Sequence, residues 1–378
     1  MTPPLVALEI GSTKVACAIG LPRESLPGFE LLGSSLLAYP APSEAWLSDP
    51  LMVGRTIEQA LEATAVSGDF HRALVAMSHP LLAHEQVRAS ILLGDEPMVV
   101  RAQDLDRLRV RALDQVLSVD REPLAIERLG CSGNGFDGVQ EPVGRSATRL
   151  AGTFHIVTMP MAARRAVVQS VESAGLEAIH LTWSLPAVAA SVIKEHPGHH
   201  RVLLIDLGGL NTDLGLFVEG RLRNARTVPW GGLSLAIEIA RSLQVTLEQA
   251  ISLSLEGLAS RKAAICQSVE AGLQVLQQAL EQMLQGEPLP ETALITGRGA
   301  LMDGVGEWVE RVTTVKTAVA RSPQTQTMGE LAQQMALSPV LGLLELATQT
   351  AKGRTLARPT RLVDRLIDRT KTVLTEYF

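Results

Sequence analysis

A short pattern of an acidic residue, any residue and a glycine occurs twice, each time at the end of an apolar run. The first copy is Glu9-Ile10-Gly11-Ser12-Thr13, and the second is Asp206-Leu207-Gly208-Gly209. Each copy leads into a further apolar run, which predicts a β-hairpin. Glycines let the backbone approach phosphate oxygens, and successive N–H groups of such a turn form an anion-binding nest. The repeat therefore predicts two hairpin loops around one phosphate-bearing ligand.

The polar side chains at the two loops favour the same chemistry. Ser12 and Thr13 offer hydroxyl donors, and Lys14 offers a positive charge. We expect the carboxylates of Glu9 and Asp206 to face each other across the cleft between the hairpins. Two acidic residues beside a triphosphate suit Mg²⁺, which they hold through bridging waters. The sequence therefore predicts a magnesium-dependent phosphate site.

A third glycine-rich turn follows another apolar run, Ala293–Thr296. The residues of this turn are Gly297, Arg298 and Gly299. Small residues here would let a flat adenosine lie against the backbone. One turn of this kind is weak evidence, because a strand followed by glycine is common. Three turns in this order and at this spacing support one another and predict a nucleotide site.

The apolar pattern predicts alternating strands and helices that position these loops. In the first part of the chain we expect strands at Leu5–Ile10, Lys14–Ile19 and Glu30–Leu37, and a helix at Leu51–Ala65. After a strand at Thr153–Thr158, we expect helices at Ala162–Ala174 and Leu185–Lys194. The second part begins like the first, with strands at Val202–Gly209, Leu214–Val218 and Leu222–Val228. A long helical region, Leu233–Gln285, and a last helix, Pro339–Thr350, complete the pattern.

Residues 69–155 form a different block between these parts. Their short strands are expected at Ala73–Met77, Val87–Leu92 and Pro123–Leu129, with one helix at Ala102–Gln115. Glycine and asparagine cluster at 130–138. This mixture predicts an inserted α+β subdomain.

Length and composition limit the class of protein. The chain has 378 residues, of which 46% are hydrophobic, so we expect more than one domain. Its formal net charge of -6 gives no electrostatic match for nucleic acid. The three cysteines are far apart, which fits a reducing cytoplasm. We find no signal peptide and no stretch of about 20 apolar residues, so any membrane contact should be peripheral.

The last residues form an amphipathic pattern. Arg361–Phe378 carries basic residues on one helix face, and these suit an anionic membrane surface. An alternative is a helix that packs on the body or on another subunit. The apolar face, expected to enter the membrane, consists of Leu362, Val363, Leu366, Ile367, Val373, Leu374, Tyr377 and Phe378.

The order of these motifs resembles the actin-fold ATPases, and within them the FtsA family. The resemblance includes the two hairpin loops, with Asp213 following the second, and the turn Thr296-Gly297-Arg298-Gly299-Ala300. Three further stretches are similar to FtsA segments: Glu141–Gly144 with Arg149-Leu150, Val171–Glu177, and Val228-Pro229-Trp230-Gly231-Gly232. The resemblance covers nearly the whole chain.

The resemblance implies an α/β fold of the actin/Hsp70/sugar-kinase type, built from two ribonuclease H-like halves. The first actin-like subdomain would comprise 1–68, 156–198 and 335–350, with 69–155 as the inserted subdomain. The second would comprise 199–242 and 290–334, with 243–289 as a reduced helical subdomain and 351–378 as linker and membrane helix.

The resemblance also implies a function at the division site, on the cytoplasmic side of the cell membrane. ATP and Mg²⁺ would be the cofactors, with Asn211, Gly231 and Gly232 joining the loop residues above as nucleotide contacts. The partners would be the C-terminal peptide of FtsZ, further copies of the chain, an anionic membrane and later division proteins.

Several positions depart from the family pattern. Leu210 and Asn211 stand where the second loop usually has glycine and threonine, and Arg298 stands where glycine is usual. Leu210 would place a side chain where backbone should touch phosphate. Thr246–Gly257 lacks the family's lysine, although Glu248 offers an acid. We therefore expect at most a weak ATPase.

Two alternatives remain open from the residues alone. One is a PilM-like pilus-assembly scaffold, and the other is an actin-like scaffold whose nucleotide site has degenerated. A small-molecule kinase of the same superfamily would need a catalytic carboxylate and a substrate pocket, for which the sequence carries no signature.

Overall fold

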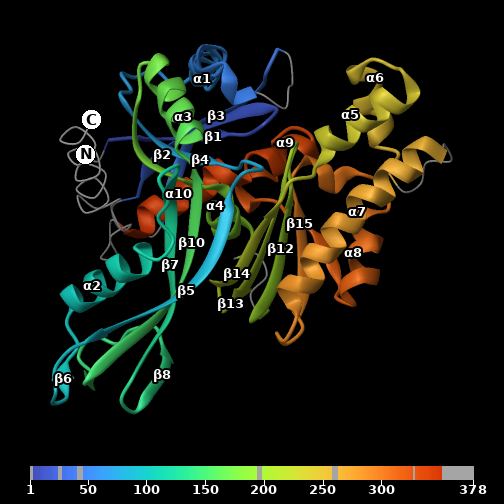
Figure 1. Cartoon of the computed structure of the whole chain (residues 1–378). Helices are drawn as coiled ribbons and strands as arrows, with labels where there is room; N and C mark the ends of the chain where they lie inside the picture. The colour runs from blue at the N-terminus through green and yellow to red at the C-terminus, as the bar shows by residue number, and fades with distance from the viewer. Residues whose placement is uncertain are drawn as a thin grey trace.

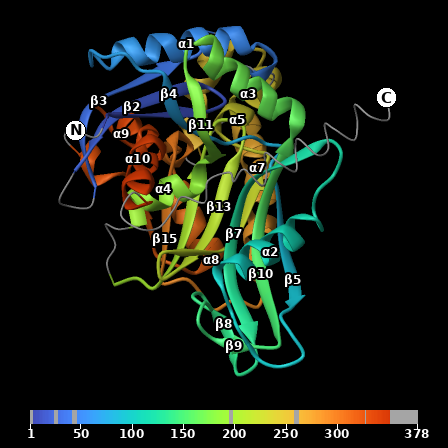
Figure 2. The ribbon, with the colours of Figure 1, turned by 90° about the vertical axis from the view of Figure 1, so that its left-hand side faces the viewer.

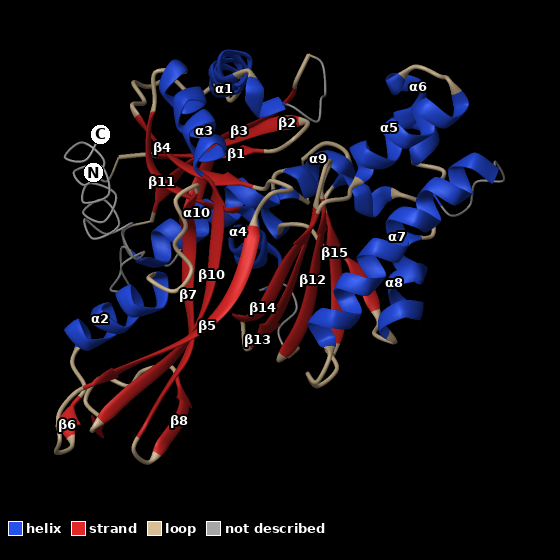
Figure 3. Ribbon diagram, viewed as in Figure 1, coloured by secondary structure: helices blue, strands red, loops and turns tan. Residues whose placement is uncertain are grey.

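The computed structural model describes residues 3–23, 28–40, 46–193, 198–257, 263–326 and 328–350. Two five-stranded sheets form the body, and a four-stranded sheet extends from it (Figure 1). A two-stranded ribbon lies at the far end of that extension, as the strands coloured red in Figure 3 show. The expected membrane helix, 361–378, lies outside the described residues.

The first body sheet is built around the N-terminal hairpin. Its strand order is β11-β4-β1-β2-β3, with β1 antiparallel to β2 and parallel to β4. The strands are β1 (Leu5–Ile10), β2 (Lys14–Pro22), β3 (Phe29–Ala38), β4 (Arg72–Met77) and β11 (Glu177–Trp183).

Alternate residues of β1 and β2 serve two different cores. Leu8 and Val15 pack toward α1 (Pro50–Ala63) and α3 (Met161–Ser173). The small side chains of Ala7 and Ala16 face the opposite layer, formed by α4 (Ser184–Val192) and α10 (Ser338–Thr350). This period of two explains why the N-terminal hairpin is buried on both faces and reads as a continuous apolar run.

The second body sheet repeats the topology of the first. Its order is β14-β13-β12-β15-β16, in which β12, β13 and β14 are antiparallel neighbours and β15 is parallel to β12. The strands are β12 (Arg201–Leu207), β13 (Thr212–Val218), β14 (Arg221–Val228), β15 (Thr292–Thr296) and β16 (Thr317–Val319). Both halves therefore consist of an antiparallel hairpin extended by parallel strands, as the sequence repeat predicted.

Helices cover one face of the second sheet. Leu203 and Ile205 share a core with residues of α5 (Gly232–Leu243), α7 (Ala263–Leu284) and α8 (Val305–Thr313). Two shorter helices, α6 (Leu247–Ser254) and α9 (Leu331–Ala336), complete this half. In the described residues, the expected long helical region consists of three helices, α5, α6 and α7, and 243–290 contains no strand there.

The extension lies beside the first sheet and points away from it in both views (Figures 1 and 2). Its sheet has the order β5-β10-β7-β8, and α2 packs against β5 and β10. The elements are β5 (Ala83–Leu92), α2 (Ala102–Leu113), β7 (Arg121–Gly133), β8 (Phe136–Val139) and β10 (Arg149–Pro160), with the ribbon β6 (Met98–Val99) and β9 (Ser146–Ala147).

The structure corrects one assignment within the insertion. The strand Ala73–Met77, which we expected inside 69–155, belongs to β4 (Arg72–Met77) and pairs instead with β1 and β11 of the first sheet. Residues Ala73 to Met77 are all buried, as in a central parallel strand covered on both faces. The other expected edge, at 155, falls within β10. Strand β11 was not predicted at all.

No helix among the described residues is both long and apolar enough to cross a membrane.

Candidate functional site

The two hairpin turns predicted from the repeat meet in space. In the first turn the Gly11 N–H donates to the Lys14 carbonyl at 3.0 Å, and in the second the Gly208 N–H donates to the Asn211 carbonyl at 3.0 Å. The two turns thus have the same internal hydrogen bond. A direct bond joins them, because the Leu210 N–H donates to Ser12 Oγ at 3.1 Å.

The close approach of the backbones depends on glycine. A Cβ atom at Gly231 would lie 2.6 Å from the carbonyl oxygens of Gly208 and Gly209. Those two carbonyls accept hydrogen bonds from the Gly232 and Leu233 N–H groups, at 3.0 and 2.7 Å. The second hairpin turn therefore lies against the N-terminus of α5, which no larger residue at position 231 would allow.

Several backbone donors at the turns remain available. The N–H groups of Ser12, Thr13 and Gly209 make no hydrogen bond within the described part of the chain. Buried N–H groups are nearly always paired. Donors left free at the junction of two turns suit an anion such as phosphate, which helix and loop N–H groups commonly bind.

Carboxylates gather at the base of the hairpins. Glu9 is 6% exposed, and its Oε2 forms an ion pair with Lys14 Nζ at 2.7 Å. Asp206 faces Asp213 as a cross-strand partner in the second hairpin. Like charges placed directly opposite each other on a sheet are unfavourable without a counter-charge.

The titration of these acids reflects their crowding. Burial, followed by the charges of Asp213 and Glu9, raises the pKa of Asp206 to about 7, against the lowering effect of Lys14. Burial raises the pKa of Asp213 to about 6, although hydrogen bonds from Ser78 and Thr227 oppose the shift. A cation placed here would relieve the repulsion.

The acids fit Mg²⁺ as outer ligands rather than as a complete cage. Among the described residues, no group of three His, Cys, Asp or Glu side chains is arranged to hold a metal directly. Mg²⁺ keeps several waters and is usually shared between one or two carboxylates and substrate phosphates. Glu9 and Asp206 suit that arrangement.

The third turn joins the same site. Gly297 has a φ of +78°, and a Cβ there would lie 2.5 Å from Asp206 Oδ1 and 2.4 Å from the Leu207 carbonyl oxygen. Gly299 is buried against Leu207, whereas Arg298 is exposed. The buried Thr296 Oγ1 has no hydrogen-bond partner among the described residues. The turn therefore offers a tight backbone and one unused hydroxyl beside the carboxylates.

The two unusual residues of the second turn lie inside the protein. Leu210 is 5% exposed and packs in the core shared by the two halves, so the expectation that its side chain meets phosphate is not supported. The Asn211 amide donates to Ser78 Oγ at 2.5 Å and to Asp213 Oδ2 at 3.4 Å. Glu248 is exposed in the first turn of α6.

The sequence analysis assigned no ligand contact to two residues of the site. Asp213 was recognised as part of the second motif but not as a site residue, although alternation along the strands places it opposite Asp206 on a shared face. Ser78 follows β4, and its hydroxyl donates to Asp213 Oδ2. No local signal could have found Ser78, because its partner is 135 residues away.

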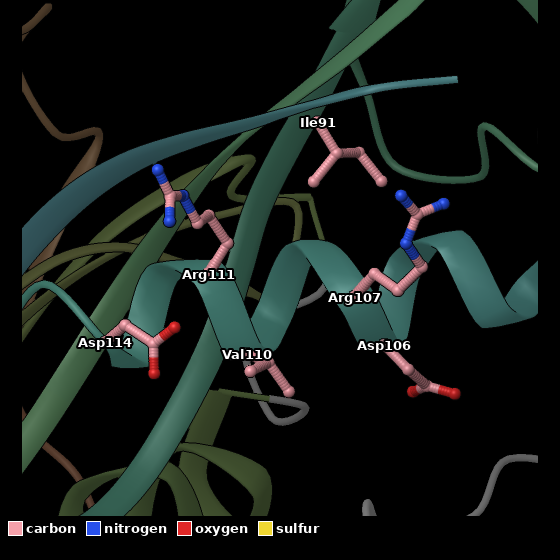
Figure 4. A pocket seen from close by; sticks show the side chains of 6 residues that line it. All are labelled: Ile91, Asp106, Arg107, Val110, Arg111 and Asp114. Atoms are coloured by element: carbon pink, nitrogen blue, oxygen red, sulfur yellow. The ribbon is translucent and has the colours of Figure 1, made fainter. Parts of the chain in front are cut away.

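Two surface hollows lie elsewhere. One of about 380 Å³ lies between α2 and β5 of the insertion, and Figure 4 shows Arg107 and Arg111 on its side of the helix. Another of about 580 Å³ lies between the end of α7 and the end of α8. Neither is lined by a hairpin residue, so they are separate from the candidate site.

Comparison with known proteins identifies the insertion. The family described as the SHS2 domain inserted in FtsA matches residues 82–158. This match begins after β4, in agreement with the placement of β4 in the first sheet.

Curated relatives extend the match beyond the insertion. The chain is 25% identical over 249 residues to the cell division protein FtsA of Pseudomonas aeruginosa, and 28% identical over 254 residues to that of Agrobacterium fabrum. These matches cover 65% and 64% of this chain. They span 59% and 57% of the relatives' own lengths, which is less than two thirds of each.

Among solved structures, the chain resembles a chain of the PilM–PilN type IV pilus biogenesis complex. The TM-score is 0.66 at 15% sequence identity, covering 93% of this chain and 98% of that chain. At this identity the likeness concerns the fold alone. The predicted actin-like fold is confirmed, and the chain contains, in its first half, the SHS2 domain described as inserted in FtsA and is similar to FtsA proteins over about two thirds of its length.

Proposed function

We propose that this protein is an FtsA-like division protein that binds Mg-ATP between its two hairpins. The observation that carries the proposal is the junction of the hairpins, where free N–H groups of Ser12, Thr13 and Gly209 lie beside buried acids. The curated FtsA relatives support the assignment to cell division.

Each group at the junction would have a separate role. The free N–H groups bind and orient the phosphates, and Lys14 offsets the charge of Glu9. Glu9 and Asp206 would hold Mg²⁺, and the third turn, Gly297 to Gly299, would lie against the adenosine. Bound Mg²⁺ would neutralise phosphate charge. We propose at most weak hydrolysis.

We further propose that the protein assembles with copies of itself on the inner face of the cytoplasmic membrane, at the division site. The amphipathic residues 361–378 would bind anionic lipid, with Leu366 and Ile367 among the apolar contacts. A single short helix binds weakly, so assembly would strengthen attachment through avidity. The partners would be the FtsZ C-terminal peptide and later division proteins.

Calorimetric titration of the full chain with Mg-ATP tests the nucleotide site. Asp206→Asn should weaken binding by about tenfold or more, corresponding to about 1.4 kcal/mol. Glu62→Gln, an exposed change on α1, serves as the control and should leave affinity unchanged. Absence of binding by the unaltered chain would favour an actin-like scaffold with a degenerate site.

Vesicle pelleting tests the membrane role. The full chain should sediment with vesicles that contain anionic lipid and not with neutral vesicles, and removal of 361–378 should abolish sedimentation. The alternative of a PilM-like scaffold rests on the fold similarity to the pilus complex. That alternative predicts no vesicle binding by either form and no binding of an FtsZ C-terminal peptide.

A further inference from the structure

A chain of hydrogen bonds crosses from the insertion to the second hairpin. His155 Nε2 lies 3.1 Å from His84 Nδ1, and His84 Nε2 lies 2.8 Å from Thr227 Oγ1. Thr227 Oγ1 in turn donates to Asp213 Oδ1 at 2.5 Å. The two histidines belong to β10 and β5 of the insertion, whereas Thr227 and Asp213 belong to β14 and β13.

The chain lies where two sheets meet edge to edge. Strand β5 is an edge of the inserted sheet and β14 is an edge of the second body sheet, and the two strands are in contact (Figure 1). A separate contact lies further along the same edges, where Gln86 Nε2 donates to the Arg223 carbonyl at 3.0 Å.

The two ends of this hydrogen-bond chain are buried, and its middle members, His84 and Thr227, are half-buried. His155 and Asp213 are each 1% exposed. Trp183, at the end of β11, holds both imidazoles, with its ring centroid 4.9 Å from that of His84 and 6.3 Å from that of His155. Every sheet of the body therefore contributes a residue around these two histidines.

The direction of the hydrogen bonds follows from the number of hydrogens. Thr227 has one hydroxyl hydrogen and donates it to Asp213, so its oxygen must accept the Nε2–H of His84. A neutral His84 then accepts at Nδ1 from the Nε2–H of His155. Burial, followed by the charges of His155 and Arg226, lowers the pKa of His84 to about 3, and burial lowers that of His155 to about 4.

The last atom of these hydrogen bonds, His155 Nδ1, agrees with this direction. His155 Nδ1 would be a bare acceptor, and it is buried with no hydrogen-bond partner among the described residues. The opposite direction would put an N–H at that atom with nothing to accept it, which folded proteins rarely tolerate. The donors of His155, His84 and Thr227 therefore all point toward the carboxylate of Asp213.

Asp213 is also held from the first sheet. Its second oxygen, Oδ2, accepts from Ser78, which follows β4. On the second hairpin, Asp213 lies opposite Asp206, one of the acids assigned to Mg²⁺. The orientation of this carboxylate thus depends on the first sheet, the second hairpin and the insertion together.

We propose that His84 and Thr227 are positioning residues that couple the placement of the SHS2 insertion to the candidate nucleotide site through Asp213. This inference rests on the proposed function for the identity of the ligand, although the coupling itself exists without nucleotide. A shift of β5 along β14 withdraws the His84 donor from Thr227 and frees the carboxylate to turn. In turn, a ligand that moves the Asp213 carboxylate alters the hydrogen bond between Thr227 and His84.

The first experiment reads the histidine tautomers by ¹⁵N-imidazole NMR of the full chain without nucleotide. In the unaltered protein, His84 and His155 should both be neutral Nε2–H tautomers. In Asp213→Asn, the carbonyl takes the Ser78 side, so the amide NH₂ faces Thr227. The threonine hydroxyl then turns to His84, which should change to the Nδ1–H tautomer.

Matched variants distinguish the effect of these hydrogen bonds from the effect of other contacts between β5 and β14. Gln86→Leu removes a contact between the same two strands and should leave both tautomers unchanged. In Thr227→Val, His84 should no longer be entirely the Nε2–H tautomer, because its acceptor is lost. In Thr227→Ser, which keeps the hydroxyl, His84 should remain the Nε2–H tautomer. The proposal is overturned if His84 is unaffected by both Asp213→Asn and Thr227→Val, or if Gln86→Leu produces the same change.

The second experiment measures amide hydrogen exchange with and without Mg-ATP. Nucleotide should slow exchange at both hairpin turns and in β5, and Thr227→Val should abolish the slowing in β5 alone, with recovery in Thr227→Ser. Slowing in β5 that survives Thr227→Val would overturn the coupling. If the unaltered hairpins show no slowing, the proposed ATP binding fails, and the tautomer result alone decides the coupling.

Discussion

The N–H of Leu210 donates a hydrogen bond to Ser12 Oγ at 3.1 Å, across 198 residues of sequence. This bond links the turn of the first hairpin to the turn of the second. Ser12 is 5% exposed, so water does not replace the bond easily. The two halves of the protein are thus joined at the point where each half would contact a phosphate.

Removal of the Ser12 hydroxyl should destabilise the protein. Ser12→Ala leaves the buried Leu210 N–H without its acceptor, which costs about 1–3 kcal/mol. Urea unfolding of the ligand-free chain measures the change. Ser252→Ala, an exposed change on α6, is the matched control and should alter the free energy of unfolding by less than about 0.5 kcal/mol. Equal stability of the two variants would contradict the bridging role.

Alanine at Gly231 should destabilise the second half. Its Cβ would lie 2.6 Å from the carbonyl oxygens of Gly208 and Gly209, so the turn or α5 must shift. We expect a loss of about 1–3 kcal/mol in thermal or urea unfolding. Gly306→Ala is the control, because its Cβ meets nothing within 4 Å and lies in α8. That change should stabilise by roughly 0.5–1 kcal/mol.

Loss of the Lys14 charge should weaken both folding and ligand binding. The ion pair with Glu9 is nearly buried, with 13% and 8% of the two side chains exposed. Lys14→Met leaves Glu9 as an uncompensated buried charge, at a cost of about 3–5 kcal/mol. The double change with Glu9→Gln should recover much of the stability in a double-mutant cycle. Additive losses would indicate that the pair is not coupled.

The stability of the ligand-free chain should fall as the pH rises from about 4 to about 7. The pKa of Asp206 is raised to about 7 in the folded protein, so the folded state holds a proton that the unfolded chain releases near pH 4. The resulting stabilisation is present below the unfolded pKa and is lost as the pH passes through the folded pKa. Asp206→Asn should flatten this slope by on the order of 1–3 kcal/mol. Unfolding titrations at several pH values measure it, and a slope unchanged by the substitution would count against the buried acid.

The membrane prediction depends on residues 361–378. Leu366→Asp with Ile367→Asp puts two charges on the apolar face and should abolish sedimentation with anionic vesicles. Asp364→Asn with Asp368→Asn alters the polar face instead and should preserve or strengthen sedimentation. Sedimentation that is unaffected by the first pair would contradict the assigned membrane face.

The local chemistry of the hairpins could be predicted from the sequence. The motifs that begin at Glu9 and Asp206 lead into the expected β-hairpins, because two apolar runs joined by a short glycine-containing turn favour that structure. The family prediction also came from these motifs. The insertion was recognised as a separate α+β unit, and the matched SHS2 domain, residues 82–158, overlaps the expected range 69–155 but begins later and ends three residues beyond it.

The assignment of strands to sheets was less predictable. The strand expected at Ala73–Met77 in the insertion lies in the first sheet as β4, and β11 was missed. An apolar strand carries little local information about its partners, which are chosen by long-range packing. Strand β11 did carry a local signal, because apolar and polar residues alternate from Ile179 to Trp183, and this signal was overlooked.

The sequence by itself determined the two hairpin turns, because glycine positions and apolar runs act over a few residues. Only the tertiary structure decided which side chains meet across the halves: Leu210 turned into the core, Asn211 bonded to Ser78, and Thr227 lay between His84 and Asp213. These contacts join residues from different sheets. They depend on how whole sheets pack against one another, and a local sequence pattern does not predict that packing.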